Sequence, residues 1–269
     1  MIRLKAQSVS QSVATWLTPI PLKITVHSVF KHGLNLLVNE RLIFISEAAV
    51  PHGITLMKGS MSKLASVDLQ TVVLYTHNCL HFRNMLTPIV IDFQDVPLET
   101  YNPQPLVPAR ATLIQRYQQI VHYPSMTGFD RTINDTLQIP KLQSIAPETF
   151  DDVITWLLGR GRGLTPTGDD ILLGLSIVLH TFNNPYRHAF DAALTCQLSP
   201  AATTAVSFEY LSHASEDMFS HSLLNFISIM NDDDDAAFQR ALLNLKHYGH
   251  TSGIDTLTGI AIGLAMLLF

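Results

Sequence analysis

The residues best suited to chemistry lie together in one glycine-rich segment of the chain, residues 159–174. Its glycines alternate with arginines and are followed by two adjacent carboxylates: Gly159, Arg160, Gly161, Arg162, Gly163, Asp169 and Asp170. Glycines ahead of a helix leave backbone N–H groups free to approach an anion, and the helix dipole favours negative charge there. Arginine adds charge-assisted, bidentate contacts to phosphate or carboxylate groups. The segment therefore predicts a binding site for an anionic ligand.

The two aspartates indicate that a cation accompanies this anion. Asp169 and Asp170 would repel a negative ligand, whereas Mg²⁺ is commonly held by one or two carboxylates together with ligand oxygens. An anion bridged by magnesium reconciles the two features. The segment is neither a Walker loop nor a dinucleotide-binding loop, because no Gly-Lys-Ser/Thr sequence follows it and Leu164 comes directly after the third glycine.

Part of the segment is repeated 85 residues later in the chain. Thr167–Gly174 aligns without gaps with Ser252–Gly259, and the two copies share a hydroxyl residue, two glycines, an aspartate and a leucine. Each copy has the Ser/Thr-x-x-Asp form of a capping box. This form predicts a helix with the hydroxyl residue at the N-cap and Asp170 or Asp255 at position N3.

The repeat has two interpretations. The first is structural, because caps satisfy free backbone donors and the glycines Gly174 and Gly259 would let two helices approach closely. The second is a shared ligand site. It accounts for the glycines and arginines before the first copy and for His250 and Thr251 before the second. We favour the second interpretation and expect both helix starts to face one cleft.

The composition is that of a compact globular protein. Of the 269 residues, 47% are hydrophobic and 14% are charged, and the net charge is −5. The absence of a basic stripe argues against nucleic acid as a partner. The cysteines Cys79 and Cys196 have no paired spacing and fit a reducing compartment, so we expect a cytoplasmic protein.

Neither end of the sequence predicts a targeting or membrane segment. Polar residues between Gln7 and Ser12 interrupt the first apolar stretch, which argues against an export signal. The most apolar stretch, residues 254–269, is shorter than the ~20 residues that span a bilayer and contains Asp255. We therefore expect a buried core helix there and no membrane partner.

Short apolar runs with β-branched residues dominate the first part of the chain. These runs are Lys23–Phe30, Leu34–Val38, Leu42–Ser46, Val72–Tyr75 and Pro88–Phe93. Polar breaks at residues 31–33 and 39–41 separate the first three runs. The pattern predicts a mainly antiparallel β meander or small barrel.

Helical spacing dominates the second part of the chain, after a stretch with prolines at positions 97, 103, 105 and 108. Prolines at this density oppose both helix and sheet, so we place a domain boundary near residue 108. The helical segments are Ala111–His122, Phe150–Leu158, Ile171–Phe182, Ala201–Met230 and Ala236–His247. We predict an α+β protein in which residues 1–108 form a β-rich domain and residues 109–269 form an α-helical domain that carries the paired motifs.

Two other groups of polar residues resemble metal-binding sites, but the sequence gives them little support. His77, Cys79 and His81 alternate and would share one face of a strand, but three ligands on one strand are rarely enough for a metal. Consecutive carboxylates in Asp232–Asp235 repel one another, so the run predicts a solvated acidic loop that leads into the next helix.

Polar residues also accompany the predicted helical segment 201–230. Thr203 and Thr204 precede its apolar part, where adjacent hydroxyls either cap the helix or face a ligand. Five further polar residues fall on the same predicted segment and indicate a solvated or interhelical face: Ser207, Glu209, His213, Glu216 and Asp217. No Gly-x-Ser-x-Gly elbow supports a covalent hydrolase.

At these residues the sequence resembles the AllH family. The resemblance rests on Gly159-x-Gly161-x-Gly163-Leu164-Thr165-Pro166-x-Gly168-Asp169-Asp170, on Gly249-His250-Thr251-Ser252-Gly253-x-Asp255, and on the linking stretch Thr203–Ser207. These specific motifs cover residues 150–269. The N-terminal part resembles the family only in its length and its strand-rich character.

The resemblance implies one subunit of the oxamate carbamoyltransferase of the allantoin pathway, which acts with the partner subunits FdrA (AllF) and AllG. The implied reaction is phosphorolysis of an N-carbamoyl acid such as oxalurate to oxamate and carbamoyl phosphate, with Mg²⁺ as cofactor. Attack by phosphate on a carbamoyl group needs charge neutralisation and alignment more than a protein nucleophile. This requirement agrees with the anion and cation sites expected from the residues.

The resemblance also implies a role for each motif residue. Expected contacts to substrate are Arg160, Gly161, Arg162, Gly163, Thr165, Thr167, Gly168, Thr203, Thr204, Thr251, Ser252 and Gly253. Mg²⁺ is expected at Asp169, Asp170 and Asp255, and Asp170 is also expected to act in catalysis. His250 is the expected proton carrier, with bonding to its own helix terminus as the alternative.

Two further functions compete with a carbamoyltransferase component. One is a non-catalytic scaffold subunit, in which the glycine-rich caps shape a docking surface for catalytic partner chains. The other is a stand-alone hydrolase that uses Asp169 and Asp170 to bind a metal and activate water.

Overall fold

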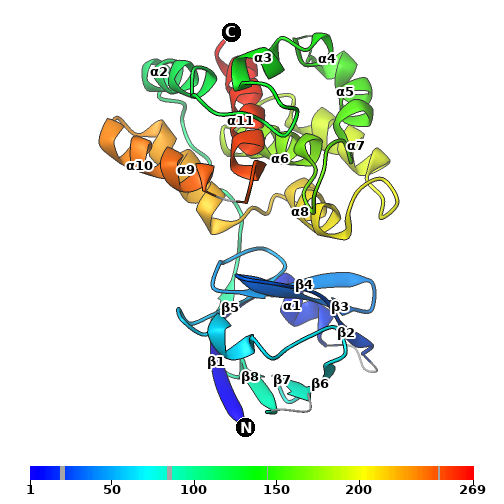
Figure 1. The fold of residues 1–269 in the computed structure, drawn as a ribbon. Helices are drawn as coiled ribbons and strands as arrows, with labels where there is room; N and C mark the ends of the chain where they lie inside the picture. The colour runs from blue at the N-terminus through cyan, green and yellow to red at the C-terminus, as the bar shows by residue number, and fades with distance from the viewer. Residues whose placement is uncertain (19–21, 84–86, 144, 248) are drawn as a thin grey trace. The chain divides into compact units, whose positions relative to one another are not determined.

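The computed structural model describes residues 1–18, 22–83, 87–143, 145–247 and 249–269. The chain divides into two compact units. The first comprises residues 1–101 with residues 220–222, and the second comprises residues 102–219 and 223–269. The division after Tyr101 falls inside the proline-containing stretch. Strands make up most of the first unit and helices most of the second (Figure 1), which confirms the predicted α+β class.

The first unit is built on one sheet, which has nine strands in the described part of the chain. They are β1 (Ile2–Ser10), β2 (Ile24–Phe30), β3 (Gly33–Val38), β4 (Arg41–Ser46), β5 (Gly53–Leu56), β6 (Val72–Thr76), β7 (Cys79–Arg83), β8 (Ile89–Asp92) and β9 (Leu98–Glu99). A short helix, α1 (Gln11–Trp16), follows β1, and a 3-10 helix, η1 (Met61–Leu64), follows β5.

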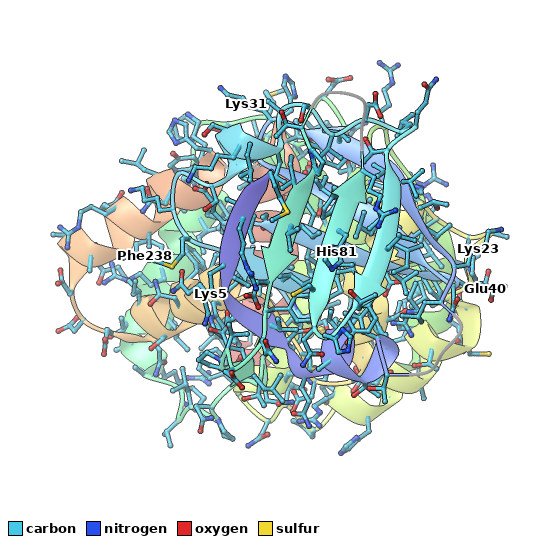
Figure 2. The ribbon with its side chains drawn as sticks, turned by 90° about the horizontal axis from the view of Figure 1, so that it is seen from below. Lys5, Lys23, Lys31, Glu40, His81 and Phe238 are labelled. Carbon is cyan, nitrogen blue, oxygen red and sulfur yellow. The ribbon has the colours of Figure 1, made fainter. Side chains whose placement is uncertain are left out.

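The sheet nearly closes into a barrel. Its strand order is β2-β3-β4-β5-β1-β8-β7-β6, and β9 also pairs with β1. The end strands β2 and β6 approach one another. Most neighbours are antiparallel, but β1 runs parallel to β8 and β9, and β4 runs parallel to β5. Figure 2 shows β1, β8, β7 and β6 side by side, with Lys5 on β1 and His81 on β7. The predicted meander or small barrel is confirmed.

Successive side chains of a strand point to opposite faces of the sheet, and those that point into the barrel are aliphatic or aromatic. Leu34 and Leu36 on β3, Ile43 and Ile45 on β4 and Phe82 on β7 are fully buried. Burying each such side chain stabilises the fold by about 1.5–3 kcal/mol, so this core accounts for much of the stability of the unit.

All five predicted apolar runs form strands, and the predicted polar breaks form turns at residues 31–32 and 39–40. The prediction that His77, Cys79 and His81 share one strand face is wrong for His77. His77 lies in the turn between β6 and β7 with a φ of 48°, so it is not on the strand that carries Cys79 and His81.

The second unit is helical. Its elements are α2 (Arg110–Val121), α3 (Ile133–Leu137), α4 (Pro140–Gln143), the 3-10 helix η2 (Pro147–Thr149), α5 (Phe150–Leu157), α6 (Thr167–Thr181), α7 (Arg187–Gln197), α8 (Ala205–Ser215), α9 (His221–Asn231), α10 (Asp235–Lys246) and α11 (Ser252–Leu268). In the described residues no helix is long and apolar enough to cross a membrane.

Helices α6 and α11 pack against each other at the centre of this unit (Figure 1), and both are buried over most of their length. Their approach depends on the last glycine of each motif copy. A Cβ placed on Gly174 would lie 2.0 Å from the carbonyl oxygen of Thr256, and one placed on Gly259 would lie 1.9 Å from that of Ile171. Ile171 and Thr256 occupy matching positions in the two copies, so the contact is symmetric between them.

The predicted single helical segment Ala201–Met230 is wrong, because two helices, α8 and α9, occupy it. The first ends at Ser215, and Asp217 adopts a left-handed φ of 65°, which a helix cannot accommodate. Glu216 and Asp217 therefore follow α8 and do not share its face with Ser207, Glu209 and His213.

Asp217 instead belongs to a hydrogen-bonded cluster around the buried His180 at the end of α6. The Nδ1 atom of His180 lies 2.6 Å from Asp217, and its Nε2 atom lies 2.9 Å from Asp191 on α7. The ring also packs edge-on against Phe219. His180 thus ties the end of α6 to α7 and to the connection after α8.

The acidic run leads into α10, as predicted. Asp234 caps that helix by accepting a 2.8 Å hydrogen bond from the amide of Ala237. Asp235 pairs with the buried guanidinium of Arg116 and also accepts a hydrogen bond from Gln119.

Candidate functional site

The two copies of the repeated motif lie side by side at the starts of α6 and α11. The hydroxyl oxygens of Thr165 and Ser252 are 2.8 Å apart and share a hydrogen bond. A Cβ placed on Gly128 would lie 2.0 Å from the hydroxyl of Thr167 and 3.1 Å from that of Thr251. Residues 87 positions apart in the sequence therefore form one polar cluster. We call it the paired-motif cluster: Thr165, Thr167, Asp170, Thr251, Ser252 and Asp255.

The predicted capping boxes are wrong. Helix α6 begins at Thr167 with Pro166 at the N-cap, and α11 begins at Ser252 with Thr251 at the N-cap. Neither N-cap side chain accepts a hydrogen bond from the first turn. Proline is well suited to a helix start because its φ is already close to the helical value. The helices thus begin one residue earlier than predicted, and their hydroxyls are free to act across the pair.

Asp170 is a buried carboxyl group in the first turn of α6. Its pKa is raised well above the usual range, first by burial and then by the negative charge of Asp255. The hydroxyls of Ser252 and Thr165 oppose the rise. One of these hydroxyls comes from the other motif copy, so the charge of Asp170 is controlled by both copies.

Asp255 holds the matching place in α11 and is fully buried. Burial raises the pKa of its carboxyl, while the amide of Gly128 and the hydroxyls of Thr251 and Thr167 oppose the rise. The amide of Gly128 donates a 2.8 Å hydrogen bond to Oδ1. Asp255 is thus influenced by a hydroxyl of the first motif copy, as Asp170 is by a hydroxyl of the second.

One oxygen of each carboxylate has no hydrogen-bond donor in the described part of the chain. These two atoms are Oδ2 of Asp170 and Oδ2 of Asp255, and both are shielded from solvent. The hydroxyls of Thr165 and Ser252 are paired with each other. An unsatisfied buried carboxylate oxygen costs free energy, so the pair favours either protonation of a carboxyl group or a bound cation.

Asp169 has a different environment, although it is adjacent to Asp170. Its Oδ1 atom accepts a 2.7 Å hydrogen bond from the amide of Gly159, and its Oδ2 atom accepts one from the hydroxyl of Thr203. Burial raises the pKa of Asp169, and the bonds from Thr203 and Gly159 oppose the rise, as does the nearby hydroxyl of Ser207. Both of its oxygens are therefore engaged within the protein.

The glycine-rich loop before α6 uses glycine where other residues would be strained. Gly159, Gly161 and Gly163 have φ values of 70°, 127° and 92°, in the left-handed region that disfavours a side chain. A Cβ placed on Gly161 would lie 2.5 Å from the amide nitrogen of Thr167. By contrast, nothing lies within 4 Å of a Cβ placed on Gly163.

Three backbone amides in the first turn of α6 already have partners. The amide of Gly168 donates to the carbonyl oxygen of Arg160 at 2.8 Å, and those of Asp169 and Asp170 donate to Pro166 at 2.9 and 3.1 Å. An anion at this helix start would therefore be held mainly by the loop and its side chains.

The two arginines of the loop differ in their surroundings. The guanidinium of Arg160 stacks on Trp156 at 4.5 Å and donates a 2.5 Å hydrogen bond to the carbonyl oxygen of the same residue. Arg162 is exposed and makes no ion pair with the described residues. Arg162 is thus the arginine that is free to meet a ligand.

The remaining predicted residues lie around the same helix starts. Thr203 contacts Asp169, and Thr204 caps α8 and donates to the carbonyl oxygen of Leu164. Gly253 packs against the end of α10, because a Cβ there would lie 1.8 Å from the carbonyl oxygen of Leu245. His250 is exposed, in the residues just before α11.

The sequence analysis missed one residue of the site, Gly128. It lies in the loop between α2 and α3, where its amide holds Asp255 and its missing side chain leaves room for Thr167. Thr127 and Gly128 repeat the hydroxyl-glycine pair of Thr167–Gly168 and Ser252–Gly253. That dipeptide is the only local signal that could have indicated it.

The arrangement can bind charge of both signs. Asp170 and Asp255 offer two buried oxygens to a cation, and the exposed loop offers Arg162 and glycine backbone to an anion. No group of three or more acidic, histidine or cysteine side chains among the described residues has a metal-binding arrangement. A cation would therefore take two protein carboxylates and complete its shell with hydroxyls or ligand oxygens, as Mg²⁺ commonly does.

Comparison with known families covers both units. The family described as oxamate carbamoyltransferase subunit AllH matches residues 157–264, which include both motif copies. The AllH family N-terminal domain matches residues 5–98, within the β unit. No solved structure matches the chain. With a match to each unit, the chain belongs to the AllH family.

Proposed function

We propose that this chain is the carbamoyltransferase subunit that binds the anionic substrates in the phosphorolysis of an N-carbamoyl acid such as oxalurate. In this reaction a phosphate oxygen bonds to the terminal carbamoyl carbon. The bond from that carbon to the adjoining nitrogen breaks, and the nitrogen takes up a proton. The products are oxamate and carbamoyl phosphate.

The observation that carries the proposal is the position of two unsatisfied, buried carboxylate oxygens, of Asp170 and Asp255, at adjoining helix starts. The glycine-rich loop with the exposed Arg162 leads into the first of these helices. Both substrates are anions, and their negative charges must be brought together before the new bond forms. Neutralising and aligning such charges is the main contribution that a protein makes to this kind of transfer.

In this proposal each group of residues has one task. Arg162 and the loop glycines bind an anionic group, and the hydroxyls of the paired-motif cluster orient the carbamoyl group. His250 supplies the proton to the leaving nitrogen. Mg²⁺, held by Asp170 and Asp255, would supply charge neutralisation between the two anions.

The partner chains are also part of the proposal. The matching family is described as a subunit, which supports a multi-subunit enzyme. We propose FdrA/AllF-like and AllG-like chains as its partners, with the chemistry completed only in the complex.

The test is formation of carbamoyl phosphate by the reconstituted complex. Asp170→Asn removes the charge but keeps the shape of the side chain, and we expect at least a hundredfold loss of turnover, in the range typical of lost electrostatic stabilisation. Asp152→Asn is the matched control, because Asp152 is an exposed aspartate on α5. If Asp170→Asn folds normally and keeps full activity, the site assignment is wrong.

A second candidate function, a non-catalytic scaffold, is favoured by the amides of Gly168, Asp169 and Asp170 at the start of α6, which are satisfied within the chain. It predicts that the isolated chain binds neither phosphate nor Mg²⁺. Calorimetric titration of the chain with phosphate, with and without Mg²⁺, separates the two. Magnesium-dependent phosphate binding would count against the scaffold. Turnover by the isolated chain without phosphate would instead indicate a hydrolase.

A further inference from the structure

We infer that Asp169 and Thr203 are positioning residues that hold the glycine-rich loop, residues 159–164, against the start of α8. The inference rests on the proposed function in one respect, namely that this loop binds an anionic substrate. It assigns Asp169 a role other than metal binding, and it assigns Thr203 a role other than direct contact with substrate.

The first connection is at the beginning of the loop. The carboxylate of Asp169 accepts hydrogen bonds from the amide of Gly159 and from the hydroxyl of Thr203, one on each oxygen. It is only 2% exposed, so water does not replace either donor. The side chain therefore joins the first residue of the loop to the residues that precede α8.

The second connection is at the end of the loop. The hydroxyl of Thr204 donates to the carbonyl oxygen of Leu164 and also accepts a 3.1 Å hydrogen bond from the amide of Ser207, which caps α8. Adjacent threonines thus hold both ends of the loop to the same helix start. Between these ends, Arg162 and Gly163 are exposed.

Close packing reinforces the first connection. A Cβ placed on Gly159 would lie 2.3 Å from the carbonyl oxygen of Ala202, just before the two threonines. The positive φ of Gly159 adds to the requirement for glycine. The beginning of the loop thus has one favoured path, whereas its exposed middle is free to meet a ligand.

The chemistry of Asp169 explains why a carboxylate stands here. Gly159 donates through its amide and Thr203 through its hydroxyl, and Ser207 is a further hydroxyl next to the carboxyl group. An ionised carboxylate accepts from both Gly159 and Thr203, whereas an asparagine amide would turn two N–H donors toward one of these groups. Holding the loop before the ligand arrives lowers the entropy lost on binding, so the expected effect is on substrate affinity.

The kinetic test uses Thr203→Val and Thr203→Ser in the reconstituted complex. Valine removes the donor and serine keeps it. We expect Thr203→Val to raise the KM for one of the two anionic substrates, the one that the loop binds, about tenfold, as for one lost hydrogen bond to a charged group, with a smaller change in kcat. Thr203→Ser should restore the KM of the wild type. An unchanged KM, or an equal KM for the valine and serine variants, would overturn the inference.

A second measurement does not depend on the reaction. Backbone amide hydrogen exchange in residues 159–164 of the complex should become faster in Thr203→Val and in Asp169→Asn, which keeps the side-chain shape. Thr155→Val, an exposed threonine on α5 that bonds Gln197, is the matched control and should leave the loop unchanged. Exchange as slow as in the wild type in both variants would contradict the inference.

The outcomes for the two proposals are distinguishable. A wild-type complex that forms no carbamoyl phosphate would contradict the proposed function, while faster loop exchange in the variants would still support the positioning role. An active complex with unaltered loop exchange and an unaltered KM in Thr203→Val would contradict the positioning role alone.

Discussion

The hydroxyl oxygens of Thr165 and Ser252 lie 2.8 Å apart, and this hydrogen bond joins the starts of two helices that are distant in the sequence. The two copies also affect each other's carboxylates. The hydroxyl of Ser252 lowers the pKa of Asp170, and the hydroxyl of Thr167 lowers the pKa of Asp255. Each motif copy is therefore incomplete without its counterpart. A substitution in one motif copy should therefore alter the packing or the carboxylate pKa of the other copy.

Gly174→Ala and Gly259→Ala should each destabilise the helical unit. The added methyl group would lie about 2 Å from a backbone carbonyl oxygen of the facing helix, so α6 and α11 would have to move apart. We expect a loss of at least about 1–3 kcal/mol in the free energy of unfolding, measured with urea. Asn244→Ala, at an exposed position on α10, should change it by less than about 0.5 kcal/mol. Equal effects for the three variants would argue against the glycine contact.

Arg162→Ala should weaken substrate binding more than Arg160→Ala. Arg162 is exposed, whereas Arg160 is held on Trp156 by stacking and a hydrogen bond. A lost charge-assisted contact is worth roughly 1.5–3 kcal/mol, so the KM for the anion bound there should rise by at least tenfold in Arg162→Ala. Steady-state kinetics of the complex with each variant provide the measurement. A larger KM change in Arg160→Ala would show that the wrong arginine has been assigned.

The stability of the chain should depend on pH through Asp170. Its pKa is raised in the folded protein, so the folded state binds a proton more readily than the unfolded state does. The contribution of Asp170 to stability is therefore fully present below its usual pKa of 3.8 and is lost as the pH rises through the raised value. With a chelator present, Asp170→Asn cannot ionise and should be more stable than the wild type at pH 7.

Each unit of raised pKa corresponds to about 1.4 kcal/mol, so urea unfolding at pH 7 can resolve this difference. The difference should shrink as the pH falls toward 3.8. Added Mg²⁺ should stabilise only the wild type, because a ligand that binds the folded state raises its stability. A variant that is less stable than the wild type at pH 7 in the chelator would refute the prediction.

His180→Ala should destabilise the helical unit by at least about 1–3 kcal/mol, the usual cost of removing a buried hydrogen-bonding partner. Its ring bonds carboxylates on both sides, and the substitution would leave Asp191 and Asp217 without their shared partner. Thermal unfolding followed by circular dichroism measures the effect. His188→Ala, an exposed histidine on α7, serves as the control and should leave the melting temperature nearly unchanged.

Strands and helices with a regular apolar period could be predicted from the sequence, whereas strand β1 and helix α7 could not. The run Leu34–Val38 was found because all of its residues except Asn35 are apolar, and Leu34, Leu36 and Val38 are buried. Strand β1 was missed because its buried positions include Ser8 and Ser10, which resemble surface residues in the sequence. Helix α7 was missed because only Phe190 and Leu194 are buried on it.

The candidate site shows the same division between local and distant information. The helix starts at Thr167 and Ser252 could be predicted within one residue, because turn and cap residues act locally. The hydrogen bond from Gly128 to Asp255 spans 127 positions, and no local pattern encodes it. The repeat distinguishes Asp170, which aligns with Asp255, from Asp169, but no local pattern indicates that Gly159 and Thr203 hold Asp169.

Because α6 packs against α11, α6 cannot complete its packing during synthesis until α11 has been made. About 70 residues separate the end of α6 from the start of α11, and a ribosome needs roughly 4–14 s to add them. During that interval α6 exposes apolar surface that only α11 will cover, and Asp170 lacks Ser252 and Asp255. The proposed cation site, which needs Asp255 of α11, would therefore be incomplete on the nascent chain until that helix has been synthesised and has docked.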